Sequence, residues 1–516
     1  MIKISVVIIT FNEERNIGRC IDSVRKVADE IVVVDSYSKD RTKEICLEKG
    51  VRFIENAFGG HIQQKNFALS HASYDYVLSL DADEALSEKL EKSILEVKAN
   101  AGHQAYSMNR ITSLGNSWIY TTDWYPDRKL RLWNKKHGSW GGYNPHDRVI
   151  VNKGTSVSHL RGNLKHYGYD GVESLFHKAN LYAMIFAREH RFKMRSSFFK
   201  IIYKTFFTFF RNYIIKLGIF GGYNGLLISF SNACYTFFKY AILKELNRKL
   251  KVSLIITTYN RKDALELVLL SVLNQSVLPD EVIVADDGSR DDTRQLVESM
   301  AKTFPVPLIH CWHEDEGFRL SAIRNKAIAQ AKYEYLIMVD GDIVLHRHFI
   351  KSHKKHAEKG FFIQGSRVLL MDGITTKALN EKISDLHFLN SGTQSRLNAL
   401  YLPSLSRLAS YKNTNLYNIR GCNLSFWRDD IKNINGFNED FLGWGREDNE
   451  FMVRMMNNDI RCYKMKLEGF GFHLNHSESS RAMLPQNQLI LDTAIASQSK
   501  RCNNGIDKYF HVLAEV

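Results

Sequence analysis

The feature that most constrains this chain is a repeat, because the order of motifs in its first half recurs in its second half. Three segments have counterparts: ISVVIITFNEE and VSLIITTYNRK, EIVVVDSYSKDRT and EVIVADDGSRDDT, and QKNFALSHASYDYVLSLDAD and IRNKAIAQAKYEYLIMVDGD. The aligned polar residues are Thr10 with Thr258, Asn12 with Asn260, Asp35 with Asp286, Lys65 with Arg324, and Asp81-x-Asp83 with Asp340-x-Asp342. Since all three pairs keep their order, the sequence predicts two copies of one domain.

Each copy begins with an apolar run, a turn, an amphipathic helix and a second apolar run. The runs are Ile4–Thr10 and Ile31–Val34, then Val252–Thr257 and Glu281–Ala285. Alternating strands and helices predict an α/β fold with a mostly parallel, Rossmann-like sheet. Ligands of such sheets bind at the carboxyl ends of the strands. Because the repeated polar residues follow predicted strands, we expect them to meet at one rim in each domain.

The length of 516 residues predicts more than one domain. We expect domains at residues 1–170 and 251–516, joined by a helical segment at 171–250. The seven cysteines are far apart and form no CxxC pair, and the start of the chain reads as a strand rather than a signal peptide. These features favour a reducing cytosol.

The segment at 171–250 carries most of the net charge of +14, with 13 Lys+Arg against 3 Asp+Glu. It is also rich in aromatic residues, which cluster between Phe198 and Tyr213 with lysines and arginines among them. This pattern favours a helix lying on an anionic membrane surface, although packing between two domains would also account for it. Leu217–Phe238 is long enough to span a bilayer, but its glycines and asparagines weaken insertion. Nucleic acid is not expected, because no binding motif is present.

Each copy has an Asp-x-Asp motif after a predicted strand, which places two carboxylates about 6–7 Å apart along the backbone. Both carboxylates can approach one hard cation, and Mg²⁺ or Mn²⁺ prefers such oxygen ligands, shared with substrate phosphates. The sequence therefore predicts metal–phosphate binding at both motifs, with a solvated acidic turn as the alternative.

Together these motifs resemble family 2 glycosyltransferases of the GT-A fold. The resemblance implies that Asp35 and Asp286 contact the uracil of a UDP-sugar and that Thr10 and Thr258 contact the nucleotide. It implies that Asp83 and Asp342 are metal ligands and that Asp81 and Asp340 lie against the ribose or the metal shell. We also expect nucleotide-sugar binding from the other repeated polar residues, which are Asn12, Asn260, Lys65 and Arg324.

The second copy also contains RGCNLSFWRDDIKNINGFNEDFLGWGREDNEF, which resembles a signature of galactosyl- and N-acetylgalactosaminyl-transferases, including bacterial chondroitin-type polymerases. The match implies that Asp448 is the general base and that Trp444, Gly445 and Glu447 shape the acceptor site. It also implies metal-binding roles for two histidines further on, His473 and His476. Imidazole ligands favour Mn²⁺ over Mg²⁺.

The first copy lacks that block and has the motif NPHDR, followed by HLRGNLKHYGY. It resembles the lipopolysaccharide-core glucosyltransferases, where a His-Glu pair stands in place of His146-Asp147. The resemblance implies that Asp147 is the base, on a side chain one methylene shorter, and that His166 is the metal's histidine. A solvated loop is the alternative for His146 and Asp147.

These patterns predict an inverting, metal-dependent, bifunctional glycosyltransferase that adds two sugars to a bacterial surface glycan such as lipopolysaccharide, lipooligosaccharide or capsule. We expect a lipid-linked or lipopolysaccharide-type acceptor and a position at the inner face of the bacterial cytoplasmic membrane. Three alternatives stay open: a processive two-sugar polymerase, one active domain beside a silent acceptor-binding domain, and a nucleotidyltransferase. The last of these does not explain WGREDNEF.

Overall fold

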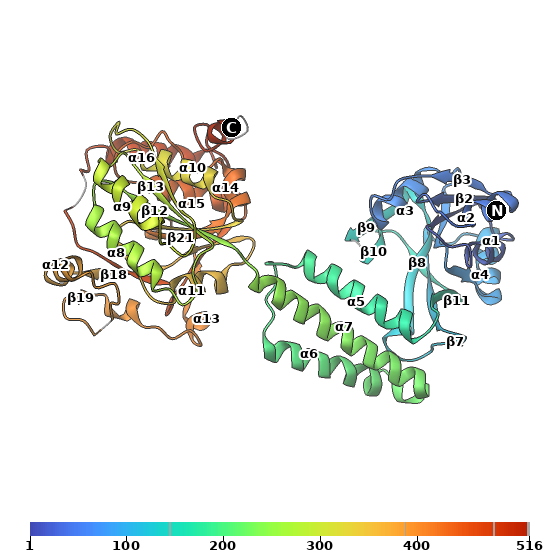
Figure 1. The fold of residues 1–516 in the computed structure, drawn as a ribbon. Coiled ribbons are helices and arrows are strands. Elements are labelled where there is room, and N and C mark those ends of the chain that lie inside the picture. The colour runs from blue at the N-terminus through green and yellow to red at the C-terminus, as the bar shows by residue number, and fades with distance from the viewer. Residues whose placement is uncertain (144–145, 388, 478–479, 513–516) are drawn as a thin grey trace. The chain divides into compact units, whose positions relative to one another are not determined.

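The structure, a computed structural model, describes residues 1–143, 146–387, 389–477 and 480–512. It divides into two compact units (Figure 1). Unit 1 comprises Met1–Glu189 and Ser196–Lys244, and unit 2 comprises His190–Arg195 and the chain from Glu245 onward. Each unit holds one copy of the repeat. The prediction of two α/β domains joined by helices is confirmed.

Unit 1 is built on a sheet with the strand order β3-β2-β1-β4-β8-β6-β11-β5, with β7 (Ser117–Trp118) paired to β6. The other strands are β1 (Ile4–Thr10), β2 (Glu30–Asp35), β3 (Arg52–Glu55), β4 (Tyr76–Asp81), β5 (Glu84–Leu86), β6 (Ala105–Leu114), β8 (Asp127–Asn134) and β11 (Val157–Tyr169). The first four strands in the order are parallel, whereas β8 runs antiparallel to β4 and β6. A separate hairpin, β9 (Gly138–Tyr143) and β10 (His146–Val151), follows β8.

Strand β1 shows why this sequence forms a buried central strand. Its residues ISVVIIT are mostly β-branched and almost all are buried, as expected for a strand covered on both faces. The helices that follow the first four strands are α1 (Ile17–Val24), α2 (Thr42–Glu48), α3 (His61–Ser70) and α4 (Glu88–Ala99). Helix α1 buries Ile17, Cys20, Ile21 and Val24, which lie on one helical face. The apolar cores therefore form on both faces of the sheet.

Unit 2 repeats this plan in a sheet with the order β14-β13-β12-β15-β21-β17-β22-β20. Its strands are β12 (Val252–Thr258), β13 (Glu281–Asp286), β14 (Leu308–Trp312), β15 (Tyr335–Asp340), β17 (Phe361–Gln364), β20 (Tyr411–Asn413), β21 (Asn423–Trp427) and β22 (Arg461–Lys464). A smaller sheet contains β16 (Ile343–Leu345), β18 (Ser366–Leu370), β19 (Thr393–Gln394) and β23 (Phe470–His473). The helices are α8 (Lys262–Leu273), α9 (Asp291–Ala301), α10 (Leu320–Gln330), α11 (Phe349–His356), α12 (Asp372–Glu381), α13 (Ser406–Ala409), α14 (Arg428–Ile434), α15 (Glu447–Asn457), α16 (Leu484–Ala496) and α17 (Asp507–Val512).

The strand registers of the two units agree at the rim where the polar residues lie. Thr10 is level with Asp35 at the ends of β1 and β2, and Thr258 is level with Asp286 at the ends of β12 and β13. The first aspartate of each Asp-x-Asp motif is the last residue of β4 or β15, the strand that pairs with the other edge of β1 or β12. The repeat seen in the sequence is therefore also a repeat in space.

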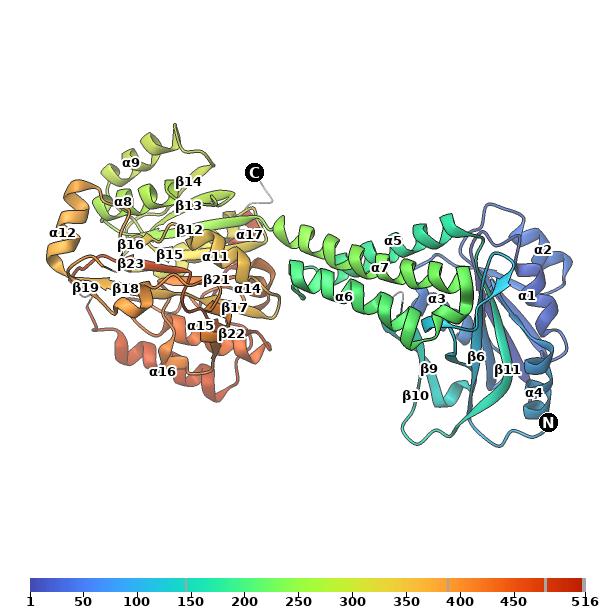
Figure 2. The same ribbon diagram turned by 90° about the horizontal axis from the view of Figure 1, so that it is seen from below.

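Three long helices leave the sheet of unit 1: α5 (Val172–Glu189), α6 (Phe198–Phe210) and α7 (Gly222–Arg248) (Figure 2). Short π and 3-10 turns at Arg211–Ile215 and Gly218–Gly221 connect α6 to α7. By length and composition alone, Gly218–Arg248 is apolar enough to cross a membrane, and it is one-third buried within the protein.

Candidate active site

A turn after the first strand of each unit is closed by the repeated asparagine. Asn12 has a left-handed backbone with φ of 53°, which asparagine tolerates better than most residues. Its side chain accepts a hydrogen bond from the Lys39 amide at 2.8 Å, and its own amide donates to Ser38 Oγ at 2.7 Å. The same two bonds recur at 3.0 and 2.8 Å in unit 2, among Asn260, Arg290 and Ser289. The asparagine thus ties the turn after the first strand to the turn after the second strand.

The aspartate that ends the second strand is buried in both units. Asp35 accepts hydrogen bonds from the amide and hydroxyl of Ser38. Asp286 accepts one from the amide of Ser289 at 2.8 Å and lies 2.9 Å from His310 Nε2. Beside these carboxylates, the buried hydroxyls of Thr10 and Thr258 have no hydrogen-bond partner among the described residues. The fold therefore leaves one unpaired buried hydroxyl at the end of the first strand in each unit.

A cation on a helix links the first Asp-x-Asp carboxylate to a distant aspartate in both units. In unit 1, Lys65 Nζ on α3 lies 2.9 Å from Asp81 and 2.8 Å from Asp147. In unit 2, the guanidinium of Arg324 on α10 lies 3.5 Å from Asp340 and 3.1 Å from Asp448. Both cations are almost fully buried. The two candidate bases therefore occupy matching electrostatic positions, although their surrounding sequences differ.

The asparagine that follows each cation in sequence, Asn66 or Asn325, holds the backbone of a distant aromatic residue by the same two hydrogen bonds. Asn66 donates to the carbonyl of Trp140 at 2.9 Å and accepts from the Trp140 amide at 3.1 Å. Asn325 makes the same pair of bonds to Phe437, both at 2.8 Å. The aromatic rings lie under the cations, with Lys65 4.4 Å from the Trp140 ring centroid and Arg324 5.1 Å from that of Phe437.

Asp448 lies in the first turn of helix α15 and has a second contact besides Arg324. The backbone amide of Gly421 donates to Asp448 Oδ2 at 2.5 Å. A Cβ atom added to Gly421 would lie 2.2 Å from Asp448 Oδ1, so a larger residue there would force the Asp448 carboxylate to move. Asp147 lies on β10, next to residues 144 and 145, which together with the side chain of His146 are outside the described part of the chain.

The second Asp-x-Asp carboxylate faces histidine in both units. Asp83 lies 3.2 Å from His166 Nε2, and Thr112 bonds to the other ring nitrogen of His166 at 3.1 Å. Asp342 lies 3.7 Å from His473 and 3.1 Å from His476. Strand pairing sets His166 against Glu84 and His473 against Ile343, and each of these partners directly follows its Asp-x-Asp motif. His166 is thus the structural counterpart of His473.

These residues fit a divalent cation, which the family resemblance implies. One ligand atom from each of Asp342, His473 and His476 can be chosen so that all three lie within 4.8 Å of one another. One carboxylate oxygen of Asp342 is buried without a hydrogen-bond partner. A carboxylate with two imidazoles suits Mn²⁺ better than Mg²⁺. The guanidinium of Arg261 also lies 2.8 Å from Asp342, so a bound cation would share this carboxylate with it.

The two rims differ in charge balance. Burial alone would raise the pKa of Asp81, but Lys65 and Arg131 bring it well below its usual range. At Asp340, burial and the neighbouring carboxylates outweigh Arg324 and raise the pKa to about 6. Arg131, which bonds to Asp81 at 3.0 Å and to Glu84 at 2.8 Å, adds to this difference.

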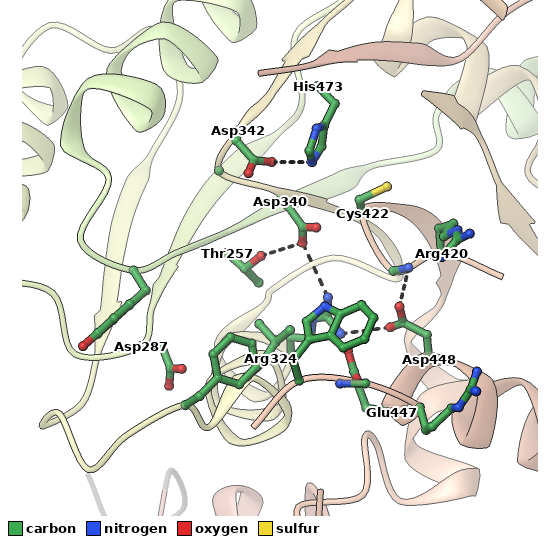
Figure 3. A pocket seen from close by; sticks show the side chains of 18 of the residues that line it. Thr257, Asp287, Arg324, Asp340, Asp342, Arg420, Cys422, Glu447, Asp448 and His473 are labelled. Carbon is green, nitrogen blue, oxygen red and sulfur yellow. Dashed lines mark hydrogen bonds and ion pairs between the residues drawn. The ribbon is translucent and has the colours of Figure 1, made fainter. Parts of the chain in front are cut away.

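In unit 2 the rim lines a cavity of about 510 Å³ (Figure 3). Thr257, Asp340, Asp342, Arg324, Glu447 and Asp448 point into this space. Trp444, Gly445 and Arg420 also line this cavity. Burial and the adjacent Asp448 raise the pKa of Glu447 to about 7. The cavity thus combines a carboxylate beside two imidazoles, a buried arginine and an aspartate held by a backbone amide, which suits displacement of a phosphorylated leaving group by a hydroxyl.

Several residues of these sites did not stand out in the sequence. They are Glu84, Arg131 and Trp140 in unit 1 and Arg261, Gly421 and Phe437 in unit 2. Trp140 and Phe437 contact the Lys65-Asn66 and Arg324-Asn325 pairs, and these repeated pairs were the only feature of the sequence that pointed toward such contacts. The contact between each cation and its distant aspartate depends on tertiary folding and had no local signal.

The profile of glycosyl transferase family 2 matches residues 5–162 and 253–433, which is more than half of the chain and includes both copies of the repeat. The chain belongs to glycosyl transferase family 2. A second profile, described as the N-terminal domain of galactosyltransferase, matches residues 406–477. That range contains Gly421, Asp448, His473 and His476, so the second profile covers the part of unit 2 that faces the strand ends.

Three family relatives each align with less than half of the chain. An uncharacterised glycosyltransferase of Rickettsia typhi is 33% identical, covering 48% of this chain and 89% of the relative. A chondroitin synthase of Escherichia coli is 27% identical, covering 42% of this chain and 34% of the synthase. A lipopolysaccharide core biosynthesis glycosyltransferase of Rhizobium meliloti is 28% identical, covering 45% and 89%. The chain is thus a glycosyltransferase related to chondroitin synthases and lipopolysaccharide core transferases.

Proposed function

We propose that both units transfer sugars, each from its own UDP-sugar donor, to a bacterial surface glycan. The observation that carries this proposal is the matched arrangement of Lys65, Asp81 and Asp147 with Arg324, Asp340 and Asp448. A silent acceptor-binding unit would have no need of a buried cation held between two carboxylates. Such an arrangement is costly unless every charge is paired, so its presence in both units favours two working sites.

The proposed reaction is inverting. Asp448 in unit 2 and Asp147 in unit 1 accept the proton of the acceptor hydroxyl while its oxygen attacks the anomeric carbon and the bond to the diphosphate breaks. Arg324 and Lys65 hold these carboxylates in position through their ion pairs. Mn²⁺ or Mg²⁺, held by Asp342 with His473 and His476 or by Asp83 with His166, would neutralise charge on the departing diphosphate. No protein nucleophile is required, so an α-linked donor would give a β-linked product.

The acceptor proposal is a lipid-linked or lipopolysaccharide-type glycan, and it rests on the two named relatives. The unlike acceptor sides of the units, with WGRED in unit 2 and NPHDR in unit 1, favour two different linkages. A processive polymerase would instead make long chains while unused acceptor remains. The length of the products therefore distinguishes a polymerase from two transferases that each add one sugar.

The test is a screen of UDP-sugars with Mn²⁺, in which UDP release is measured for the intact protein, Asp83→Ala and Asp342→Ala. Two surface carboxylates serve as matched controls, Asp75→Ala in unit 1 and Asp385→Ala in unit 2. We expect the intact protein and both controls to use two sugars, and each site variant to lose one of them. If Asp342→Ala removes all activity and Asp83→Ala removes none, unit 1 is a binding module and the two-site proposal is wrong.

A second experiment addresses the base of unit 2. Asp448→Asn should lower the rate of transfer by that unit about 10²–10⁴-fold, since this is the range of general base catalysis. UDP binding should change little, because the carboxylate lies on the acceptor side. An unchanged transfer rate would remove Asp448 from this role.

A further inference from the structure

Helices α6 and α7 of unit 1 expose large apolar side chains. Phe199 and Phe206 of α6 are 83% and 69% exposed, and Phe220 in the connecting turn is 79% exposed. Helix α7 carries an exposed stripe at Tyr223, Leu226, Phe230 and Phe237, whose spacing keeps these residues on one face of the helix. Monomeric soluble proteins rarely expose such a continuous apolar surface.

The buried side of α7 consists mainly of small and polar residues instead. Helix α6 buries Ile201 alone, whereas α7 buries mainly glycine, serine, alanine and threonine. Asn212 and Asn232 are hydrogen bonded at 3.0 Å, and Thr208 and Thr236 at 3.2 Å. The connecting turn also packs closely against α7, because a Cβ atom on Gly225 would lie 1.8 Å from the carbonyl of Gly218 in that turn.

This arrangement is the reverse of a helix pair in water, where the apolar faces turn inward. Small residues and side-chain hydrogen bonds between helices, with phenylalanine and leucine outside, are typical of helices whose outer surface meets lipid. The polar contacts help to hold the pair together, and large aromatic side chains of both helices are left exposed.

The charge of the same segment identifies which lipid surface it suits. Residues 190–244 contain no Asp or Glu. Burial, together with nearby Lys204, Lys200 and Arg211, lowers the pKa of Lys239, so positive charges gather here. Arg211 is paired with Asp123, but the same stretch carries further lysines, including Lys216 and Lys244. Cations beside exposed aromatic residues complement an anionic phospholipid surface.

We propose that the exposed face of α6, the connecting turns and α7 lies in the interface of an anionic phospholipid bilayer, with its aromatic side chains among the acyl chains. This proposal goes beyond the sugar-transfer function and does not depend on it. Helix α7 does not span the bilayer, because its Ile228 packs with Leu114, Ile119 and Leu175 of unit 1. A spanning α7 would leave those core side chains without a partner.

The test is sedimentation of the full-length protein with phosphatidylcholine vesicles, prepared with and without phosphatidylglycerol. We expect binding to the phosphatidylglycerol vesicles, and at least about tenfold weaker binding to pure phosphatidylcholine, from the loss of electrostatic attraction. The variant Phe199→Gln/Phe206→Gln/Phe220→Gln should lose at least about tenfold in affinity. Its matched control is Leu389→Gln/Leu397→Gln/Leu408→Gln, at residues of unit 2 that are 75%, 80% and 85% exposed; it should bind as the intact protein does.

A charge variant, Lys204→Gln/Lys216→Gln, should weaken binding to the anionic vesicles, whereas Lys153→Gln/Lys302→Gln should not. Circular dichroism checks that every variant is folded, and extraction with alkaline carbonate should release the bound protein. The proposal is overturned if the intact protein fails to bind, if the two apolar triple variants bind equally, or if carbonate leaves the protein in the membrane, as for a spanning helix. The exposed face would instead bind a second copy of the chain if two results are found together. The intact protein would fail to bind vesicles, and it would form a dimer that the Phe199 triple variant dissociates.

Discussion

Lys65 and Asp147 are 82 residues apart in the chain, yet Lys65 Nζ lies 2.8 Å from the carboxylate of Asp147. The corresponding pair in unit 2, Arg324 and Asp448, is separated by 124 residues and lies at 3.1 Å. The sequence around Asp147 has no similarity to the WGRED segment around Asp448. The two aspartates are therefore equivalent because of the cations they contact, rather than because of their local motifs.

The first prediction concerns that cation. Arg324→Met leaves the partly exposed Asp340 and Asp448 without their ion-pair partner; removal of one member of a fully buried ion pair costs about 3–5 kcal/mol, which is the upper limit here. We expect transfer by unit 2 to fall at least about 100-fold, with Arg324→Lys recovering part of the loss because Lys65 serves in unit 1. Transfer by unit 1, measured with its own donor, is the internal control. Equal activity of the methionine and lysine variants would contradict the role of the charge.

The second prediction concerns Gly421. Gly421→Ala places a methyl group against Asp448, so the carboxylate must move from its place beside the amide that holds it. We expect transfer by unit 2 to fall at least about tenfold, because small displacements of catalytic groups are costly. Gly373→Ala is the matched control, since a Cβ atom there would meet nothing within 4 Å. Equal rates for the two variants would show that Asp448 tolerates the shift.

The third prediction concerns the cation site of unit 2. His476→Ala and His473→Ala each remove an imidazole beside Asp342 and should weaken Mn²⁺ binding about 10–100-fold, the range seen when groups that hold a metal site are removed. The exposed His387 provides the control variant, His387→Ala. Titration followed by the electron paramagnetic resonance of free Mn²⁺ measures the affinity without reference to activity. Chelation with EDTA should stop UDP release, and unchanged release would show that no cation is needed.

The fourth prediction is a pH dependence of stability. The pKa of Glu447 is about 7 in the folded protein, above the ordinary value for glutamate, so the folded state binds a proton that the unfolded chain releases. Between about pH 4.5 and 7 the stability supplied by protonated Glu447 is therefore lost as the pH rises. The variant Glu447→Gln cannot ionise, and its stability relative to the natural protein should be greater at pH 8 than at pH 5, by up to roughly 3 kcal/mol.

Thermal unfolding of the two proteins at both pH values measures this difference. The exposed Asp459 provides a control, Asp459→Asn, which should show no such change. If the stability difference between Glu447→Gln and the natural protein is the same at pH 5 and pH 8, the carboxyl group of Glu447 is ionised in the folded state.

The alternation of apolar runs and polar strand ends was enough to predict two α/β domains and to place Asp35, Asp81 and their counterparts at one rim. The prediction of these strands was correct because a run of β-branched residues favours a buried strand over a helix. The prediction of the rim was correct because parallel strands bring their carboxyl ends to the same edge of a sheet. The antiparallel strands β8 and β21 beside the central strands were not predicted. Their pairing depends on contacts between segments distant in the chain, which no local period encodes.

The sequence by itself determined the repeat, the family and the residue types at each site, because those are properties of short segments and their order. Only the tertiary structure decided that Lys65 and Arg324 bridge to Asp147 and Asp448, and that His166 matches His473. It also decided that the phenylalanines of α6 face outward while asparagine and threonine face inward. The physical reason is that a side chain's partners are set by which segments the folded chain brings within a few ångströms, and composition alone does not specify this.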